Sequence, residues 1–92
     1  MYTVNFENDK RKSKANKKTH GIDFDEAQTL WGDKYMVKIP STQVAKEEAR
    51  FLYIGMIGSK HWTAITTYRD LDLYRIISVR RSRKQEIEIY ES

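Results

Sequence analysis

The chain has 92 residues, of which 39% are hydrophobic and 33% charged, and its formal net charge is +4 at pH 7. A chain of this length forms a small core, so we expect residues 1–92 to fold as a single domain. The absence of cysteine excludes disulfides and thiolate metal sites, and no apolar run is long enough to cross a bilayer. No apolar N-terminal segment directs secretion, which predicts a cytoplasmic protein without membrane contact.

Positive and negative charges are segregated along the chain. One acid-free run of cations comprises Lys10, Arg11, Lys12, Lys14, Lys17 and Lys18, and a second cluster comprises Arg75, Arg80, Arg81, Arg83 and Lys84. Acids gather at 23–26 and at 47–48. This distribution predicts an anionic partner, either nucleic acid or an acidic protein, and a membrane surface fits it less well.

The N-terminal segment predicts a strand and then a helix. Residues 2–6 alternate in polarity, as in a strand near a sheet edge. Asp9 is a suitable N-cap for a helix over 10–19, and Gly21 a suitable left-handed stop. This helix has almost no apolar face, so we expect its ends and its lysine stems to hold it in place.

A second, short helix follows. Asp23 and Glu26 have the spacing of a capping box, and the apolar residues that reach Trp31 at helical spacing predict docking on the core. Residues 35–39 alternate as a strand, and a loop continues to about residue 49.

The second half of the chain predicts an antiparallel meander. Strands are expected over 50–57, 62–68 and 74–80, joined by turns short enough for hairpins, and the tail over 82–90 is expected to be helical. The order is β-α-α-β-β-β-β-α. We therefore predict an α+β fold, a small antiparallel sheet with helices packed on one face.

The last predicted strand is rich in arginine at both ends. Strict alternation places Ile77 and Val79 on one face, and Ile76, Ser78 and Arg80 on the other. The first face suits a core, and the second suits an anion, because guanidinium groups bind phosphate with paired hydrogen bonds. The alternative is a central strand whose arginines only flank it in water.

No pattern for a metal or a nucleotide is present. The glycines do not form a phosphate-binding loop, and the two histidines lack partners at ligand spacing. Asp23, Asp25 and Glu26 are of the ligand type that magnesium prefers, but helix capping accounts for Asp23 and Glu26. Ser78 lacks the glycines of a hydrolase elbow. We expect no metal and no cofactor.

The cationic residues suit RNA cleavage by attack of a ribose 2′-hydroxyl. That reaction needs cations for the phosphorane and groups that accept and donate protons. His20 is the natural proton carrier, although a histidine at a helix C-terminus is equally favoured by the helix dipole. Arg50 has an alternative as a surface ion pair with Glu48, and Arg69 as a turn residue.

Ordered blocks across the chain resemble the BrnT toxin family. In the first half they are Phe6-Glu7-Asn8-Asp9, Lys14-Ala15-Asn16, His20-Gly21-Ile22 and Phe24-Asp25-Glu26-Ala27. In the second half they are Arg50-Phe51, Ile54-Gly55 and Arg75-Ile76-Ile77-Ser78-Val79-Arg80-Arg81 before Glu86 and Tyr90. The resemblance implies a bacterial ribonuclease toxin of the RelE-like, microbial-ribonuclease-like fold, which acts without metal and arrests translation and growth.

The resemblance also implies partners. Such a toxin cleaves RNA and forms a hetero-oligomer with a BrnA-like antitoxin, a ribbon-helix-helix protein through which alone the complex contacts DNA. We assign phosphate binding and phosphorane stabilisation to Arg50, Arg75 and Arg80, proton transfer to His20, and a backbone hydrogen bond to Ser78. Further RNA contacts are assigned to Lys17, Lys18, Arg69, Arg81 and Tyr68.

Two other functions fit the same residues. A non-catalytic nucleic-acid-binding module needs only the basic surface and aromatics such as Trp62 and Tyr68 for stacking. An inactive toxin homologue serves only as the partner of its antitoxin.

Overall fold

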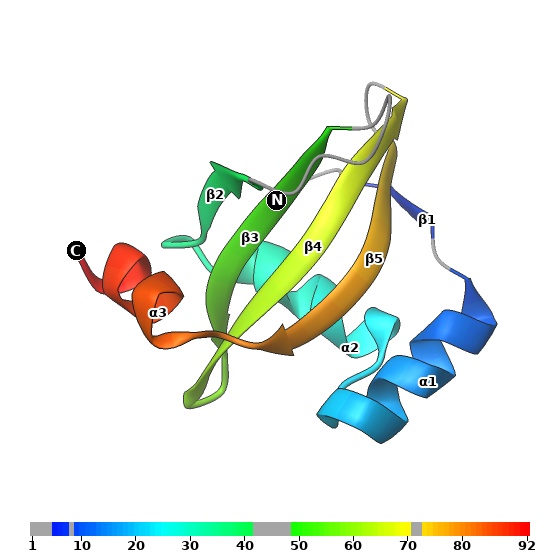
Figure 1. Ribbon diagram of the computed structural model, residues 1–92, viewed down its shortest axis with the longest axis horizontal. Coiled ribbons are helices and arrows are strands. Elements are labelled where there is room, and N and C mark those ends of the chain that lie inside the picture. The colour runs from blue at the N-terminus through cyan, green and yellow to red at the C-terminus, as the bar shows by residue number, and fades with distance from the viewer. Residues whose placement is uncertain (1–4, 8, 42–48, 71–72) are drawn as a thin grey trace.

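The computed structural model describes residues 5–7, 9–41, 49–70 and 73–92. Its elements are β1 (Asn5–Glu7), α1 (Lys10–His20), α2 (Phe24–Ala27), the 3-10 helix η1 (Gln28–Gly32), β2 (Val37–Pro40), β3 (Arg50–Ile57), β4 (Lys60–Asp70), β5 (Leu73–Arg81) and α3 (Lys84–Glu91). They form an α+β structure around a five-stranded sheet (Figure 1). Within these ranges, no helix is long and apolar enough to span a membrane.

The sheet is mixed rather than antiparallel. Its strand order is β1-β5-β4-β3-β2, and β2 to β5 form an antiparallel meander. The edge strand β1 pairs with the start of β5 in parallel, so the predicted purely antiparallel sheet is wrong at this edge. The first three residues of the predicted strand over 2–6 lie outside the described residues.

The predicted helix ends are confirmed. The Asp9 side chain accepts hydrogen bonds from two backbone amides of the first turn of α1, and Gly21 ends that helix with a φ of 84°. Asp23 and Glu26 form the predicted capping box of α2. The short helix then tightens into η1, which carries Trp31 onto the sheet.

One face of the sheet, here called the covered face, packs against α1, α2 and η1 (Figure 1). Its core contains Phe24, Leu30 and Trp31 from the helices against Ala64 and other strand residues. On β3, the residue opposite Leu30 is Gly55, where a Cβ would lie 3.0 Å from Leu30 Cδ2. The absence of a side chain there lets η1 approach the sheet closely.

The opposite face, here called the open face, is bordered by α3. Glu86 of α3 accepts a hydrogen bond from Thr63 of β4, and Ile54 of β3 is fully buried although it lies outside the main core cluster. The end of α3 is attached to the body where Tyr90 Oη donates to Asp33 at 2.6 Å. The prediction that all helices pack on one face is therefore wrong for α3.

A β-bulge in β5 sets which side chains face the open side. Ile65 of β4 lies opposite Ser78, whereas the next residue of β4 lies opposite Ile76, so Ile77 is inserted without a partner. Ile76 and Val79, exposed by 2% and 0%, consequently share the covered face. The predicted alternation is thus wrong for Ile76 and Ile77, because it assumed an uninterrupted strand.

Beyond β1, a side chain of α1 takes the place of a neighbouring strand for β5. Asn16 Nδ2 donates to Val79 O at 2.8 Å, and Asn16 Oδ1 accepts from Val79 N at 3.1 Å. Ser13, also buried in α1, accepts a hydrogen bond from Phe24 N. Buried polar side chains therefore hold α1, rather than only its ends and lysine stems.

Candidate nucleic-acid interface

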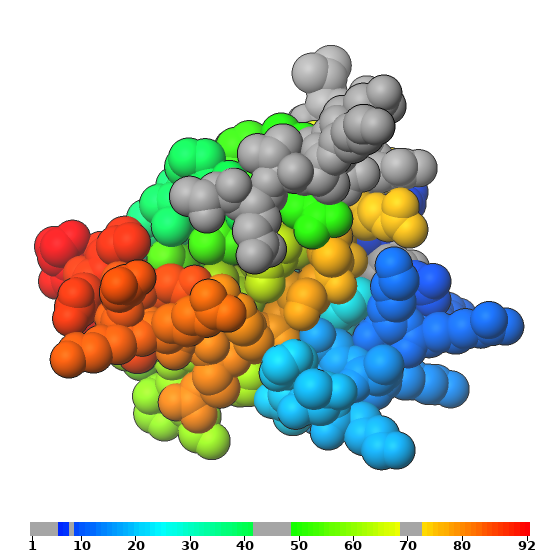
Figure 2. Space-filling model, viewed as in Figure 1, coloured from blue at the N-terminus to red at the C-terminus, as the bar shows by residue number. Residues whose placement is uncertain are grey.

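The open face contains a hollow of about 450 Å³ between the strands and α3. The residues that line it include Arg50, Arg80, Arg83, Ser78, Leu52, Ile65 and Ile77, and we call it the open-face hollow. Figure 2 shows this side of the molecule, with the strands and α3 in front and the long side chains of α1 projecting at the edge. Two of the three arginines predicted to bind phosphate meet in this hollow.

The third predicted arginine lies on the same face but outside the lining of the hollow. Arg50 and Arg75 are both cross-strand partners of Thr67, and directly opposed residues share a face of a sheet. Arg75 Nε lies 3.8 Å from Glu7 Oε1, a loose and half-exposed ion pair. The Ile77 bulge makes this arrangement possible, because an unbroken strand would place Arg75 and Arg80 on opposite faces.

Arg80 is held by a buried carboxylate. Its Nη1 and Nη2 donate to Glu86 Oε1 and Oε2 at 2.7 and 2.8 Å, which is a two-bond guanidinium–carboxylate pair. Such a pair engages one end of the guanidinium and leaves its Nε–Nη2 side, a second fork of donors, for another anion. Glu86 therefore fixes the direction of Arg80 while its side edge can still bind phosphate.

Glu86 does not act as a proton carrier. It also accepts hydrogen bonds from Thr63 Oγ1 at 3.0 Å and from Arg83 N at 2.7 Å. Burial alone would raise the pKa of Glu86, but Arg80, Arg83 N and Thr63 together lower it to about 2. The carboxylate is therefore ionised throughout the physiological range, and its role is to hold α3 and Arg80 in place.

Ser78 and His20 lie toward the α1 edge of the open face. Ser78 lines the open-face hollow, and its Oγ donates to Asn16 Oδ1 at 3.4 Å. His20 is exposed one helical turn beyond Asn16, on the same side of α1. His20 is not among the described residues that line the hollow, so the structure does not bring the predicted proton carrier together with the arginines.

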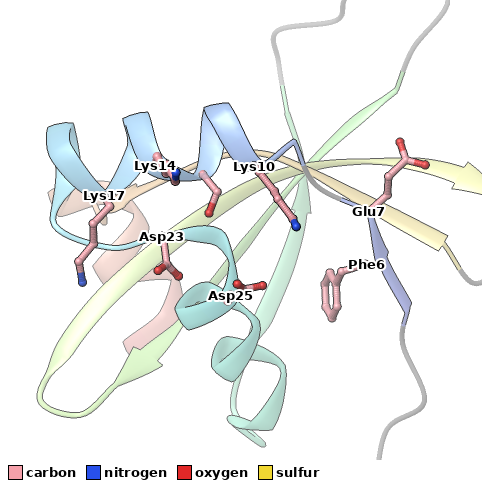
Figure 3. Close-up of a pocket in the computed structure, with 8 residues that line it drawn as sticks. Phe6, Glu7, Lys10, Lys14, Lys17, Asp23 and Asp25 are labelled. Carbon is pink, nitrogen blue, oxygen red and sulfur yellow. The ribbon is translucent and has the colours of Figure 1, made fainter.

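The predicted lysine contacts differ from each other. Lys17 Nζ donates to Glu26 at 2.7 Å, which raises the pKa of Lys17 and lowers that of Glu26, whereas Lys18 is exposed on the last turn of α1. Figure 3 shows a groove between α1 and α2, here called the α1–α2 groove, where Lys10, Lys14 and Lys17 face Asp23 and Asp25. Its mixed charge makes it a weaker phosphate site than the open face.

The other predicted RNA contacts lie apart from the open-face hollow. Tyr68 pairs with Tyr74 on the covered side, where Lys38 donates to its hydroxyl. Burial raises the pKa of Tyr68, but the hydrogen bonds to Lys38 and Tyr53 outweigh burial and hold this pKa below its ordinary value. Arg69 belongs to β4, and its side chain lies outside the described residues.

The structure also places Trp62, a predicted stacking residue, and Arg81, a predicted RNA contact, next to each other. Trp62 is only 8% exposed, so the alternative in which it stacks on a base is wrong. Its ring instead supports Arg81, whose guanidinium carbon lies 5.6 Å from the ring centre. His61, to which no chemistry was assigned, lies 2.8 Å from Glu91 and helps to attach α3.

Sequence reasoning missed the two residues that organise the site, Glu86 and Asn16. Both appeared only as parts of the family resemblance, because a buried polar side chain has no periodic signal. The bulge did leave a signal in the sequence, because the alternation of apolar and polar residues is interrupted where Ile76 and Ile77 stand next to each other. Within the described residues, no three histidine, aspartate or glutamate side chains group as a metal site.

Comparisons with known proteins agree with this picture. A family model described as the ribonuclease toxin BrnT of type II toxin–antitoxin systems matches residues 8–86. The crystal structure of the Brucella abortus ribonuclease toxin BrnT superposes with a TM-score of 0.68 at 21% identity, covering 89% of this chain and 100% of that one. That likeness shows the shared fold. No curated protein matches the sequence significantly.

Proposed function

Because the chain belongs to the BrnT family of ribonuclease toxins from type II toxin–antitoxin systems, we propose that it cleaves RNA internally, without metal, in the cytoplasm. Cleavage of this kind stops translation and growth. We also assign the chain to the RelE-like, microbial-ribonuclease-like fold class, and its α+β sheet with helices behind one face supports that assignment.

The observation that carries the proposal is the gathering of cations on the open face. Arg50 and Arg80 line the open-face hollow together with Ser78, and the Ile77 bulge turns Arg75 to the same face. Guanidinium groups fixed in advance stabilise the charge that develops on a phosphorane more effectively than water does. They supply the positive charge for which other nucleases use metal ions.

We propose a role for each predicted site residue. Arg80, directed by Glu86, and Arg50 bind the scissile phosphate, while Arg75 holds an adjacent part of the strand. Ser78 donates a hydrogen bond to the RNA backbone, and His20, which lies outside the hollow at the end of α1, transfers a proton once RNA is bound. Outer RNA contacts are proposed for Lys17, Lys18, Arg69, Arg81 and Tyr68, and the cations among them attract the polyanion to the protein.

The partner is a BrnA-like antitoxin with a ribbon-helix-helix domain, through which the hetero-oligomer binds DNA. The basic open face suits an acidic antitoxin segment, which inhibits cleavage by covering the arginines. The complex is therefore expected to lose cleavage while the toxin remains folded.

The test is incubation of the purified protein with RNA in EDTA. Shortened RNA is expected from the wild type, and none from the double variant Arg50→Ala, His20→Ala. Equal melting temperatures would show that both proteins are folded. Cleavage that persists in the double variant at the wild-type rate would place the site elsewhere.

A second function is favoured by one observation. No histidine is among the described residues that line the open-face hollow, as expected of an inactive homologue that only binds its antitoxin. That homologue would leave RNA intact and would not stop growth when expressed alone. Salt-sensitive retention of intact RNA would instead indicate a non-catalytic binding module.

A further inference from the structure

We propose that the open-face hollow holds one unpaired nucleobase of the bound RNA, with arginines on either side for the phosphates. This inference rests on the proposed binding of RNA at this face, and it does not depend on cleavage. It adds a base-binding subsite to a surface otherwise described only by its positive charge.

The floor of the hollow is an aliphatic row across the sheet. Ile39, Leu52 and Ile65 are successive cross-strand partners, and the row ends at Ser78 on β5. The bulged residue Ile77 widens this floor. All four aliphatic side chains are only half-buried, although the neighbouring Ile54 on β3 is fully buried.

Cations border this row on both sides. Arg50 lies two residues before Leu52 on β3, and Arg80 lies two residues beyond Ser78 on β5. Two residues along a strand span about 7 Å, so the rows lie next to each other on the same face. Arg50 and Arg80 line the same hollow as the aliphatic floor, which shows that they flank it.

This combination matches a nucleotide better than a bare anion. A base has apolar faces that bind an apolar surface, and it is attached to a backbone whose phosphates suit guanidinium groups. A site for phosphate alone does not need aliphatic side chains, because phosphate is bound by charged and hydrogen-bonding groups. Gln85 of α3 also lines the hollow, and its amide offers both a donor and an acceptor to a base edge.

Binding to two uncleavable strands tests the proposal. Both are fluorescent 2′-O-methylribose phosphate strands of equal length and charge, and only one carries bases. We expect the wild type to bind the base-carrying strand about tenfold more tightly. Ile65→Thr is expected to reduce this preference about fivefold, since it removes apolar floor, and to leave binding of the base-free strand unchanged.

Val37→Thr is the matched control. Val37 is the cross-strand partner of Ile54, and it is not among the described residues that line the hollow. We expect this variant to retain the full preference for the base-carrying strand. Gln85→Ala is a second variant, expected to change which base is preferred without weakening binding of the base-free strand.

Four other outcomes of these binding experiments overturn the proposal. Equal binding of the two strands by the wild type would show that only the backbone is bound. A preference that Ile65→Thr leaves intact would place the base elsewhere, and equal weakening of both strands would show that Ile65 is only structural. If Ile65→Thr weakens inhibition by an acidic antitoxin peptide and leaves the base preference unchanged, the occupant of the hollow is a peptide. Failure of RNA cleavage in EDTA affects only the proposed function.

Discussion

The two faces of the sheet use the same strands for different purposes. On the covered face, Leu30, Ala64 and Val79 are fully buried against one another and the helices. On the open face, Leu52 and Ile65 remain half-buried among arginines. The comparison indicates that the core and the proposed RNA-binding surface are separated by the direction of side chains rather than by regions of the sequence.

The bulge at Ile77 decides this separation on β5. The bulge places both Ile76 and Val79 on the covered face, although they lie three positions apart in the strand, an odd spacing. It also turns Arg75 to the same face as Arg80. Substitutions on the two faces should therefore have different consequences. Open-face changes should reduce activity, and covered-face changes should reduce stability.

The largest difference in activity is expected between variants of two neighbouring arginines, Arg80 on the open face and Arg81 on the opposite face. The double variant Arg80→Ala, Glu86→Gln should lower kcat/KM for RNA cleavage about 100- to 1,000-fold, because it removes a fixed donor to the phosphorane. Arg81→Ala, which removes an outer RNA contact and the cation beside the ring of Trp62, should lower kcat/KM about threefold. Steady-state kinetics on one fluorogenic oligoribonucleotide compares them.

The double variant is needed because Arg80→Ala alone changes stability as well. It would leave the ionised carboxylate of Glu86 buried without its guanidinium partner, at a cost of about 3–5 kcal/mol. Similar losses of activity for the Arg80 double variant and Arg81→Ala would contradict the distinction between the faces.

Acid should weaken the attachment of α3 through Glu86. The pKa of this carboxylate is lowered from 4.5 to about 2, with burial opposed by its hydrogen bonds from Arg80, Arg83 N and Thr63. A carboxylate whose pKa is lowered by folding stabilises the protein fully at pH values above its unfolded pKa. This stabilisation is lost as the pH falls, so the free energy of unfolding should decline between about pH 4.5 and 2. Glu86→Gln should be less stable than the wild type at pH 6, and the gap should narrow at pH 3. Urea unfolding at both values measures it, and a constant gap would exclude titration of Glu86.

Much of the fold was predictable because it depends on local chemistry. The cap at Asp9, the stop at Gly21 and the capping box of α2 each involve neighbouring residues. The parallel pairing of β1 and the position of α3 depend on contacts between distant segments, which no local pattern encodes. The arginines of the site were predictable by type, and their common face was not, because strict alternation ignores a bulge.

Replacing Asn16 should loosen the contact between α1 and the edge of β5 at Val79. Asn16→Leu removes both hydrogen bonds to Val79 and leaves buried backbone groups unsatisfied, which should cost about 2 kcal/mol. The amide of Val79 should then exchange with deuterium faster. Ala15→Leu, at the adjacent exposed position, should leave the exchange rate unchanged. An unaltered Val79 amide in the Asn16 variant would show that α1 does not protect this edge.

The smallest effect is expected on the covered face, at Gly55. In Gly55→Ala the new Cβ would lie 3.0 Å from Leu30 Cδ2 and 3.3 Å from Asp33 Oδ2, so η1 must move outward at a cost of about 1 kcal/mol. Gly32→Ala is the matched control, because no atom lies within 4 Å of its new Cβ, and it should leave the melting temperature unchanged or slightly higher. Both variants should bind RNA as the wild type does. A loss of RNA affinity in Gly55→Ala with retained folding would mean that the packing of the covered face controls the position of the open-face arginines, and the two faces would then be coupled rather than independent.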